Sequence, residues 1–324
     1  MPALVDRLKR RGVLGLNERN ANFIQRYNRR RLYPLVDNKL LTKRLAMEAD
    51  IAVPELYGVI DNQHSVRQLA DIVGERRDFV IKPAHGTGGD GILVVSGRSA
   101  RRQHLYRLAD GNYVSEDGIR HHVSNIISGQ YSFVGTRDSA MIEYRVETDP
   151  FFAPVTFQGV PDIRVLVYHG YPVMAMVRLP TRRSRGKANL HQGAVGVGID
   201  PVTGSTLVGV LGNEVVHEHP DTGEPIGRLD IPRWEECLTL AARCYELTGL
   251  GYLGADIVLD RFRGPLILEV NARPGLNIQI ANRVGLRDRL DLVDSWEGDY
   301  APGARVKRVR EALAPSGPRA EADR

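Results

Sequence analysis

Apolar and polar residues alternate in short runs along most of the chain, and this pattern predicts many strands separated by a few helices. Strands are predicted to end at residues 59–60 and to cover residues 79–83, 92–95 and 141–146. A hairpin is predicted around Asp110–Gly111, a turn-forming pair. Helical spacing appears over residues 37–49, 66–76 and 121–129.

The second half of the chain carries two longer hairpin patterns, at residues 162–180 and 254–275, with an amphipathic helix at 235–249 between them. One helical stripe is formed by Trp234, Cys237, Leu238, Ala241, Cys244 and Thr248. The two cysteines lie two turns apart, too far for a disulfide, so we expect buried free thiols. Residues 314–324 are polar and proline-rich, and we expect them to be disordered.

A glycine-rich loop follows the strand that carries Lys82. Gly86, Gly88 and Gly91 fit the dinucleotide-binding spacing, but the loop runs into a strand-like stretch instead of a helix, and no Gly-Lys-Ser/Thr follows it. This context favours a strand-loop-strand flap whose backbone N–H groups close over phosphate oxygens. A plain flexible hairpin with a solvated lysine is the alternative reading.

The hairpin at residues 254–275 places polar side chains on one face. Alternation puts Ala255, Ile257 and Leu259 on one side and Asp256 on the other. With a turn centred between residues 262 and 263, Asp256 lies opposite Glu269, and Asn271 shares the face of Glu269. Carboxylate and amide oxygens suit Mg²⁺ that also binds phosphate. Carboxylates paired to surface arginines are the alternative, and a one-residue slip would turn Glu269 away.

The hairpin at residues 162–180 carries two arginines. With a turn near residues 169–171, Arg164 and Arg178 are expected to lie within one position of being opposed. Paired guanidinium groups suit a carboxylate or a phosphoryl group in transfer. Surface charge on an edge hairpin is the alternative, because Pro172 is typical of edge strands.

Composition narrows the class of protein. The chain has 324 residues, 42% of them hydrophobic, which is enough for a substantial core. No run of about 18 apolar residues and no signal-like N-terminus occurs, so we expect a cytoplasmic protein without a transmembrane segment. The net charge of +5 favours anionic partners. Basic runs near residues 10, 30 and 308 are interpreted as solvated charge, and nucleic acid is not expected because no binding motif accompanies them.

Taken in order, these segments resemble the ATP-grasp superfamily, and most nearly the α-L-glutamate ligases of the RimK type and the sugar-transfer-associated ATP-grasp proteins. The resemblance rests on Lys39 in DNKLLTKRLA, Lys82 before HGTGGDG, and the segments MIEYRV, DIRV, NLHQG, GADIVLD and LILEVNARPG. It covers residues 36–285. It implies an α+β fold in which two lobes with antiparallel sheets clasp ATP.

The resemblance also implies roles for individual residues. Lys39 and Lys82 would contact phosphates under a lid of Gly86, Thr87, Gly88 and Gly89. Adenine would meet the interlobe segment of Glu143, Tyr144 and Val146, and Glu147 would reach the ribose. The implied ligands of Mg²⁺, or alternatively Mn²⁺, are Asp256, Glu269 and Asn271. The residues implied at the γ-phosphate and the substrate carboxylate are Arg164, Arg178 and Asn189.

Family chemistry implies that a carboxylate becomes an acyl phosphate, which an amine captures as an amide. The expected division of the chain is a basic helical extension (1–35), an N-terminal lobe (36–148), a C-terminal lobe (149–300) with a boundary at Asp149–Pro150, and a basic then disordered tail (301–324). Many family members carry a Rossmann-like domain before the grasp, and here about 35 residues precede Lys39, so we expect that domain to be missing or replaced by a partner.

The substrates are not named by the sequence. A basic cluster of Arg182, Arg183, Arg185 and Lys187 hints at an acidic or polyanionic substrate, or is an exposed loop. A ligase that adds glutamate or another amino acid to a peptide, protein or cell-surface precursor is the first hypothesis. A kinase acting on another acceptor and a nucleotide-sensing protein are the alternatives, and an oligomer is left open.

Overall fold

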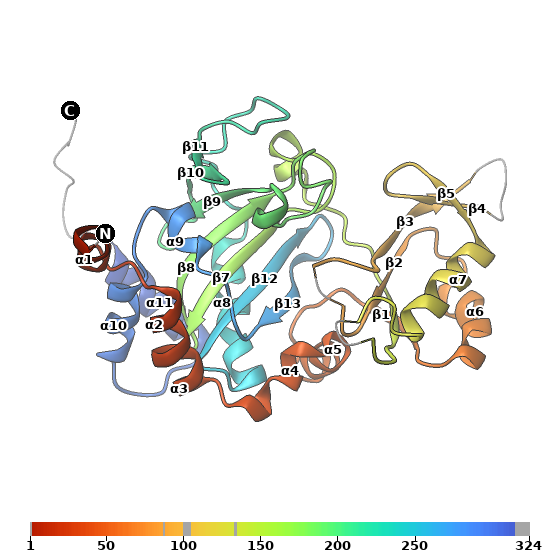
Figure 1. Cartoon of the computed structure of the whole chain (residues 1–324), viewed down its shortest axis with the longest axis horizontal. Coiled ribbons are helices and arrows are strands. Elements are labelled where there is room, and N and C mark those ends of the chain that lie inside the picture. The colour runs from red at the N-terminus through yellow and green to blue at the C-terminus, as the bar shows by residue number, and fades with distance from the viewer. Residues whose placement is uncertain (1, 87, 100–104, 133–134, 315–324) are drawn as a thin grey trace.

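Two antiparallel sheets, each packed against helices, form the two lobes of the molecule (Figure 1). The computed structural model describes residues 2–86, 88–99, 105–132 and 135–314, with side chains from residue 6 onward. The smaller N-terminal lobe and the larger C-terminal lobe lie side by side, with α4 (Pro34–Asp37) and α5 (Lys39–Glu48) between them. The prediction of two antiparallel lobes is confirmed, whereas the predicted division at residues 35, 148 and 300 stays a prediction.

The N-terminal lobe is built on a sheet with strand order β1-β6-β2-β3-β4-β5. Its strands are β1 (Leu56–Ile60), β2 (Phe79–Pro83), β3 (Leu93–Arg98), β4 (Leu105–Leu108), β5 (Tyr113–Ser115) and β6 (Ala140–Glu143). One face packs on η3 (Gln63–Gln68), α6 (Leu69–Val73) and α7 (Glu116–Ile127). Because side chains alternate along a strand, Phe79 and Ile81 enter that core while Lys82 points to the opposite face.

The C-terminal lobe is built on a longer sheet with strand order β11-β10-β9-β8-β7-β12-β13. Its strands are β7 (Asp162–Tyr168), β8 (Tyr171–Leu179), β9 (Val195–Ile199), β10 (Thr206–Leu211), β11 (Glu214–Val216), β12 (Tyr252–Asp260) and β13 (Gly264–Asn271). Both predicted hairpins are present, as β7–β8 and β12–β13. Edge strand β13 lies nearest the N-terminal lobe (Figure 1).

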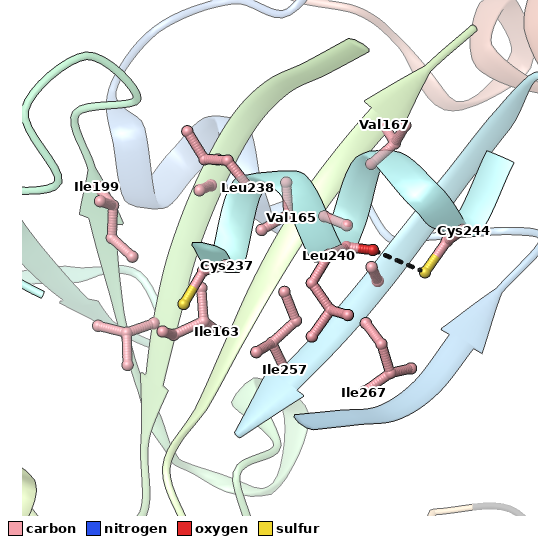
Figure 2. Close-up of a cluster of buried hydrophobic side chains, with 14 of the residues drawn as sticks. Ile163, Val165, Val167, Ile199, Cys237, Leu238, Leu240, Cys244, Ile257 and Ile267 are labelled. Carbon is pink, nitrogen blue, oxygen red and sulfur yellow. Dashed lines mark hydrogen bonds between the residues drawn. The ribbon is translucent and has the colours of Figure 1, made fainter. Parts of the chain in front are cut away.

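One face of this sheet is covered by α8 (Trp234–Thr248). The helix lays its predicted stripe on Ile163, Val165 and Val167 of β7 and on Ile257 of β12, as Figure 2 shows. Both cysteines are buried and free, as expected. Burial raises the pKa of each thiol to about 12, so neither is a reactive thiolate near neutral pH.

The opposite face is covered at one end by the N-terminal segment and by C-terminal helices. These are α2 (Leu16–Glu18), η1 (Arg19–Ile24), α3 (Gln25–Tyr27), α9 (Asn277–Asn282) and α10 (Arg287–Asp294). Helix α11 (Pro302–Leu313) contributes to the cores on both faces, with Val306 on the α8 side and Val309 on this one, and α1 (Pro2–Arg10) has exposed side chains from residue 6 onward. Leu14, Phe23 and Ile24 enter the same core as Tyr168 and Tyr252. The side chain of Asn28 donates to the carbonyl oxygens of Tyr252 (2.6 Å) and Ala272 (2.8 Å). The basic N-terminal segment is therefore an integral part of this lobe.

Two chain segments connect the lobes: the first contains Ala52 and Glu55, and the second contains Tyr144 and Glu147. Backbone hydrogen bonds join these segments to each other and to the β12–β13 hairpin. The N–H of Tyr144 donates to the carbonyl of Glu55 at 2.8 Å. The first segment is also held by β13, since Ile267 N–H donates to Ala52 O. The second is held at the hairpin end, where Arg261 N–H donates to Glu147 O. Backbone hydrogen bonds thus anchor both crossing segments to the same hairpin.

Several local expectations differ from the structure. The helix expected near residues 121–129 begins earlier, at Glu116, because Ser115 caps it by accepting from Gly118 N–H. The basic run near residue 308 is not simply solvated, since Arg305 is buried and pairs with Glu246. The expected disorder of residues 315–324 lies outside the described residues. Remaining short elements are η2 (Arg30–Leu32), η4 (Pro150–Val155) and η5 (Leu190–Gln192). No helix of the described residues is long and apolar enough to cross a bilayer.

Candidate functional site

The β12–β13 hairpin brings Asp256 directly opposite Glu269, as predicted. The turn differs from expectation, because Asp260 pairs with Gly264 and the turn is centred on Phe262. The register then shifts between Asp256 and Ile257, and this irregularity restores the predicted pairing. Asn271 lies two residues beyond Glu269, and its side-chain amide donates to Asp256 Oδ2 at 3.2 Å.

The two arginines of β7 and β8 are two positions out of register, so the prediction of near opposition was wrong. Arg164 lies opposite Met176, and Arg178 lies opposite Asp162. An even offset still leaves both arginines on the same face of the sheet, because side chains alternate with a period of two. That face also carries Asp256, so the three side chains converge.

Asp256 is the centre of an ion-pair network. The Arg164 guanidinium donates to both its oxygens, Nε to Oδ1 at 2.7 Å and Nη2 to Oδ2 at 2.6 Å. Arg178 donates to Oδ2 of Asp256 at 2.9 Å and makes a bidentate pair with Asp162 at 2.5 Å. All four side chains are mostly buried. Two buried cations and two buried anions therefore compensate one another.

The network gives its two carboxyl groups, those of Asp256 and Asp162, different pKa values. Burial alone disfavours the charged form of Asp256, but Arg164 and Arg178 outweigh it and hold its pKa at about 2. Burial raises the pKa of Asp162 to about 6, against the opposing effect of Arg178. The same two carboxylates keep the pKa of Arg178 above its usual value despite burial, so Arg178 is a permanent cation.

A second buried ion cluster lies in the N-terminal lobe. Lys82 of β2 and Lys43 of α5 contact the two oxygens of Glu143 at 2.6 and 3.0 Å, and all three side chains are at least 93% buried. Lys43 also donates to the carbonyl of Pro54. Burial lowers the pKa of Lys43 to about 8, although Glu143 opposes the shift. Burial raises the pKa of Glu143, but the two ammonium groups outweigh it and the net pKa is lowered.

Lys39 joins the two lobes. Its ammonium donates to the carbonyl of Gly86 at 2.6 Å and lies 3.1 Å from Glu269 Oε1. A cleft between the lobes is lined by Lys39, Lys43, Lys82 and Glu269, together with apolar side chains of α4, α5 and β13. Both predicted lysines and one predicted carboxylate therefore surround one interlobe cleft, and Lys39 connects this cleft to Gly86 of the glycine-rich loop.

Residues 18–295 match the profile of the sugar-transfer associated ATP-grasp family. The chain belongs to this family. No curated protein matches it. Among solved structures, the chain resembles the ATP-grasp ligase PsnB complexed with a minimal precursor, at 14% identity and a TM-score of 0.42 over 83% of this chain and 62% of that one. It thus spans about three-fifths of the length of PsnB.

Two further solved structures are similar at the same level. One is a D-alanine–D-alanine ligase from Bacillus anthracis, with 12% identity and a TM-score of 0.44 over 87% of this chain and 70% of that one. The other is the D-cycloserine synthetase DcsG, with 15% identity and a TM-score of 0.42 over 87% and 72% of the two chains.

The residues of this ATP-grasp chain that were expected at adenine and ribose lie along the lobe crossing. Tyr144 packs under the Arg263 guanidinium, 4.0 Å from the ring centroid, and burial raises its pKa to about 12. Val146 is buried with Val258 in a small apolar cluster. Glu147 is 40% exposed at its side chain and lies 3.4 Å from Arg261. Their nucleotide contacts stay predictions.

The loop residues expected at the phosphates are only partly described. Thr87 lies outside the described residues. Gly88 and Gly89 have φ of 65° and 80°, values that favour glycine. The Lys187 ammonium lies 3.3 Å from Gly88 O and 3.5 Å from Asp90, so this basic residue contacts the glycine-rich loop.

The remainder of the predicted basic cluster faces solvent. Arg182, Arg183 and Arg185 are exposed, and no ion pair is formed by them with the described acidic groups. The loop that carries them is held by close packing of Gly159 against the carbonyl of Gly186. Asn189 accepts from His191 N–H and thereby caps η5. Its role toward a substrate stays a prediction.

Sequence reasoning missed Lys43 and Asp162. Lys43 lies one helical turn after Lys39, so the i, i+4 spacing of two lysines at the start of α5 was a usable signal. Asp162 lies two residues before Arg164 on the same face of β7, and the period-two rule could have found it. Their ion partners come from other elements, which no local pattern encodes.

The predicted metal ligands have side chains of the chemical type that binds Mg²⁺. Asp256, Glu269 and Asn271 lie on one face and carry oxygen ligands of the kind that Mg²⁺ takes together with phosphate and water. Glu269 is the partly exposed carboxylate of the set. The Asp256 oxygens accept from Arg164 and Arg178, and Asn271 turns its N–H toward Asp256, so these contacts would have to open before either residue bound the ion. Within the described residues there is no group of three His, Cys, Asp or Glu that could hold a metal by protein ligands alone.

Proposed function

We propose that this ATP-grasp chain is an ATP- and Mg²⁺-dependent ligase that joins a carboxylate to an amine. In this reaction class a carboxylate oxygen displaces ADP from the terminal phosphorus to give an acyl phosphate. The amine nitrogen then attacks the acyl carbon and displaces phosphate. The observation that carries the proposal is the convergence of Arg164, Arg178 and Asp256 beside Glu269, which contacts Lys39 across the cleft.

The proposed role of each site residue follows from the charge of its side chain. Lys39 and Lys82 would bind phosphate oxygens, since both are cations on the wall of the interlobe cleft. Arg164 and Arg178 would orient the substrate carboxylate and stabilise charge that develops on the transferring phosphoryl group. Asp256, Glu269 and Asn271 would hold Mg²⁺, which supplies neutralisation of phosphate charge when bound. Mn²⁺ is an alternative ion for the same donors.

The substrate classes are also proposals. The exposed Arg182, Arg183 and Arg185 favour an acidic substrate, such as glutamate added to a peptide, protein or cell-surface precursor. The Arg178 that begins this segment belongs to the buried network, so the exposed cations lie only a few residues from the proposed reaction centre. We place the reaction in the cytoplasm, because it consumes ATP.

Trapping of the acyl phosphate tests the proposal. Purified protein is incubated with Mg–ATP, hydroxylamine and a pool of amino acids and short acidic peptides, beside Glu269→Ala and the exposed control Glu48→Ala. Hydroxamate formed with ADP, lost in Glu269→Ala and kept in Glu48→Ala, supports the ligase. ADP without hydroxamate would replace the ligase by a kinase, and ATP binding with no product at all would favour a sensing role.

A further inference from the structure

A histidine–aspartate pair lies at the start of the glycine-rich loop and has no role in the site described above. The Nδ1–H of His85 donates to Oδ1 of Asp138 at 2.8 Å. Asp138 is fully buried at its side chain, whereas about half of the His85 side chain is exposed. An oriented imidazole with one buried and one open edge is the arrangement used by acid–base residues.

The tautomer of His85 follows from the partners of Asp138. The N–H groups of His85 and Ser139 donate to Asp138 at 3.0 and 2.7 Å, in addition to the ring. A carboxylate that receives three N–H donors acts as acceptor only, so the ring places its proton on Nδ1. In the neutral ring this tautomer leaves the lone pair on Nε2, the nitrogen that does not contact Asp138.

The position of His85 ties it to the phosphate end of the cleft. It is three residues after Lys82, and the carbonyl of the next residue, Gly86, accepts from the Lys39 ammonium. Lys39 also donates its backbone N–H to the residue before His85, Ala84, and its ammonium contacts Glu269. Among the charged groups of the described residues, Asp138 contacts the His85 ring directly. Lys39 contacts the backbone of the two residues that flank His85 in the chain, Ala84 and Gly86.

The proposed reaction needs a proton acceptor that the residues named so far do not supply. An amine is protonated at neutral pH and cannot attack a carbonyl until it loses a proton. The lysines and arginines of the cleft are cations, the carboxylates of the network are paired with arginines, and the carboxylate of Glu269 is paired with Lys39. We propose that His85 deprotonates the amine substrate, with Asp138 as its positioning residue; this inference rests on the proposed function.

The step balances as follows. The ammonium of the substrate gives one proton to His85 Nε2, and the free amine attacks the acyl carbon. The new C–N bond forms as the bond from that carbon to the phosphate oxygen breaks. The departing phosphate takes the bonding electrons and the second amine proton. His85 returns its proton to water through its exposed edge.

Two nucleophiles of different basicity test this role. Hydroxylamine is largely unprotonated at pH 7 and needs no base, whereas an α-amino acid is protonated. The probes are hydroxylamine and the amino acid that wild-type protein joins in the same pooled assay. His85→Gln retains a donor toward Asp138, and His121→Gln on the exposed side of α7 is the matched control.

In His85→Gln we expect amide formation at pH 7 to fall by about 100-fold or more, while hydroxamate formation stays within about threefold. The deficit should shrink by about tenfold per pH unit above pH 7, as free amine becomes available without a base. Asp138→Asn should show the same selective loss in smaller measure. His121→Gln should change neither product.

Equal loss of both products in His85→Gln, or no loss of either, overturns the assignment, since phosphate binding or loop structure would then explain the residue. An amide deficit that does not shrink with rising pH overturns it as well. Absence of hydroxamate with the wild-type protein is a different result, because it overturns the proposed ligase and the His85 role falls with it.

Discussion

The buried cluster of Lys43, Lys82 and Glu143 makes a sharp prediction for Glu143→Gln. The change keeps the shape of the side chain and removes the anion that both ammonium groups contact. Removing one partner of a buried ion pair typically costs about 3–5 kcal/mol. Lys43 supplies part of this cost: holding it neutral at pH 7, against an ordinary pKa of 10.5, costs about 5 kcal/mol, of which wild type with a Lys43 pKa of about 8 already bears about 3.4 kcal/mol.

The sign of the pH dependence follows from the lysines. An ammonium whose folded-state pKa lies below its unfolded-state pKa costs stability at low pH, and the cost is relieved as pH rises toward 10.5. In wild-type protein this relief begins near pH 8, the pKa of Lys43. In Glu143→Gln the pKa of Lys43 should fall further, so the variant should regain about 1.4 kcal/mol relative to wild type between pH 7 and pH 8. Above pH 8 the difference should stay constant, because Lys43 is then neutral in both folded proteins.

Urea unfolding followed by far-UV circular dichroism at pH 7 and pH 9.5 measures these differences. Glu147→Gln, at a half-exposed side chain, is the control and should change stability by less than about 1 kcal/mol. The double variant with Lys43→Met removes one unpaired cation and should recover much of the loss. A loss below about 1 kcal/mol for Glu143→Gln at pH 7, or no recovery in the double variant, would refute the reasoning.

Three further predictions concern other parts of the chain. Glu269→Ala should abolish Mg–ATP turnover and leave the unfolding midpoint within a few degrees, because Glu269 is partly exposed and its ion pair in the described part of the chain is with Lys39; turnover equal to wild type would remove the metal role. Gly159→Ala should destabilise by more than about 1 kcal/mol, because a Cβ there would lie 1.8 Å from Gly186 O, as thermal unfolding can show. Cys237 and Cys244 should resist maleimide at pH 7 until urea unfolds the protein, since burial holds both thiol pKa values near 12; native-state labelling at the unfolded rate would contradict this.

The parts of the fold that follow from local patterns were predictable. The stripe that Cys237 and Cys244 share, the strand with Lys82 and the opposition of Asp256 to Glu269 each depend on spacing within one or two neighbouring elements. The last of these was reached with a turn centre half a residue off, and the irregularity in β13 made up the difference. Periodicity therefore predicts faces well and turn geometry less well.

Contacts that join distant segments were not predictable. Asn28 binds strands more than two hundred residues away, and Lys43 meets a carboxylate one hundred residues later in the chain. The buried state of Arg305 depends on its pairing with Glu246 of α8, so a basic run looked solvated when taken alone. The sequence alone shows that such a residue is charged, but it does not identify the distant partner with which the residue is buried.

The crossing of the chain between its lobes makes the protein modular. Residues on both sides of the N-terminal lobe belong to the other lobe: Asn28 holds its strands, and α11 packs on the same sheet. The segment 56–143 is therefore an inserted cassette, joined at two neighbouring strands that bond Tyr144 to Glu55. Exchange of this cassette between relatives would replace Lys82 and the glycine-rich loop while the arginine network stays untouched. The glycine-rich loop and the arginine network can in this way diverge separately within one architecture.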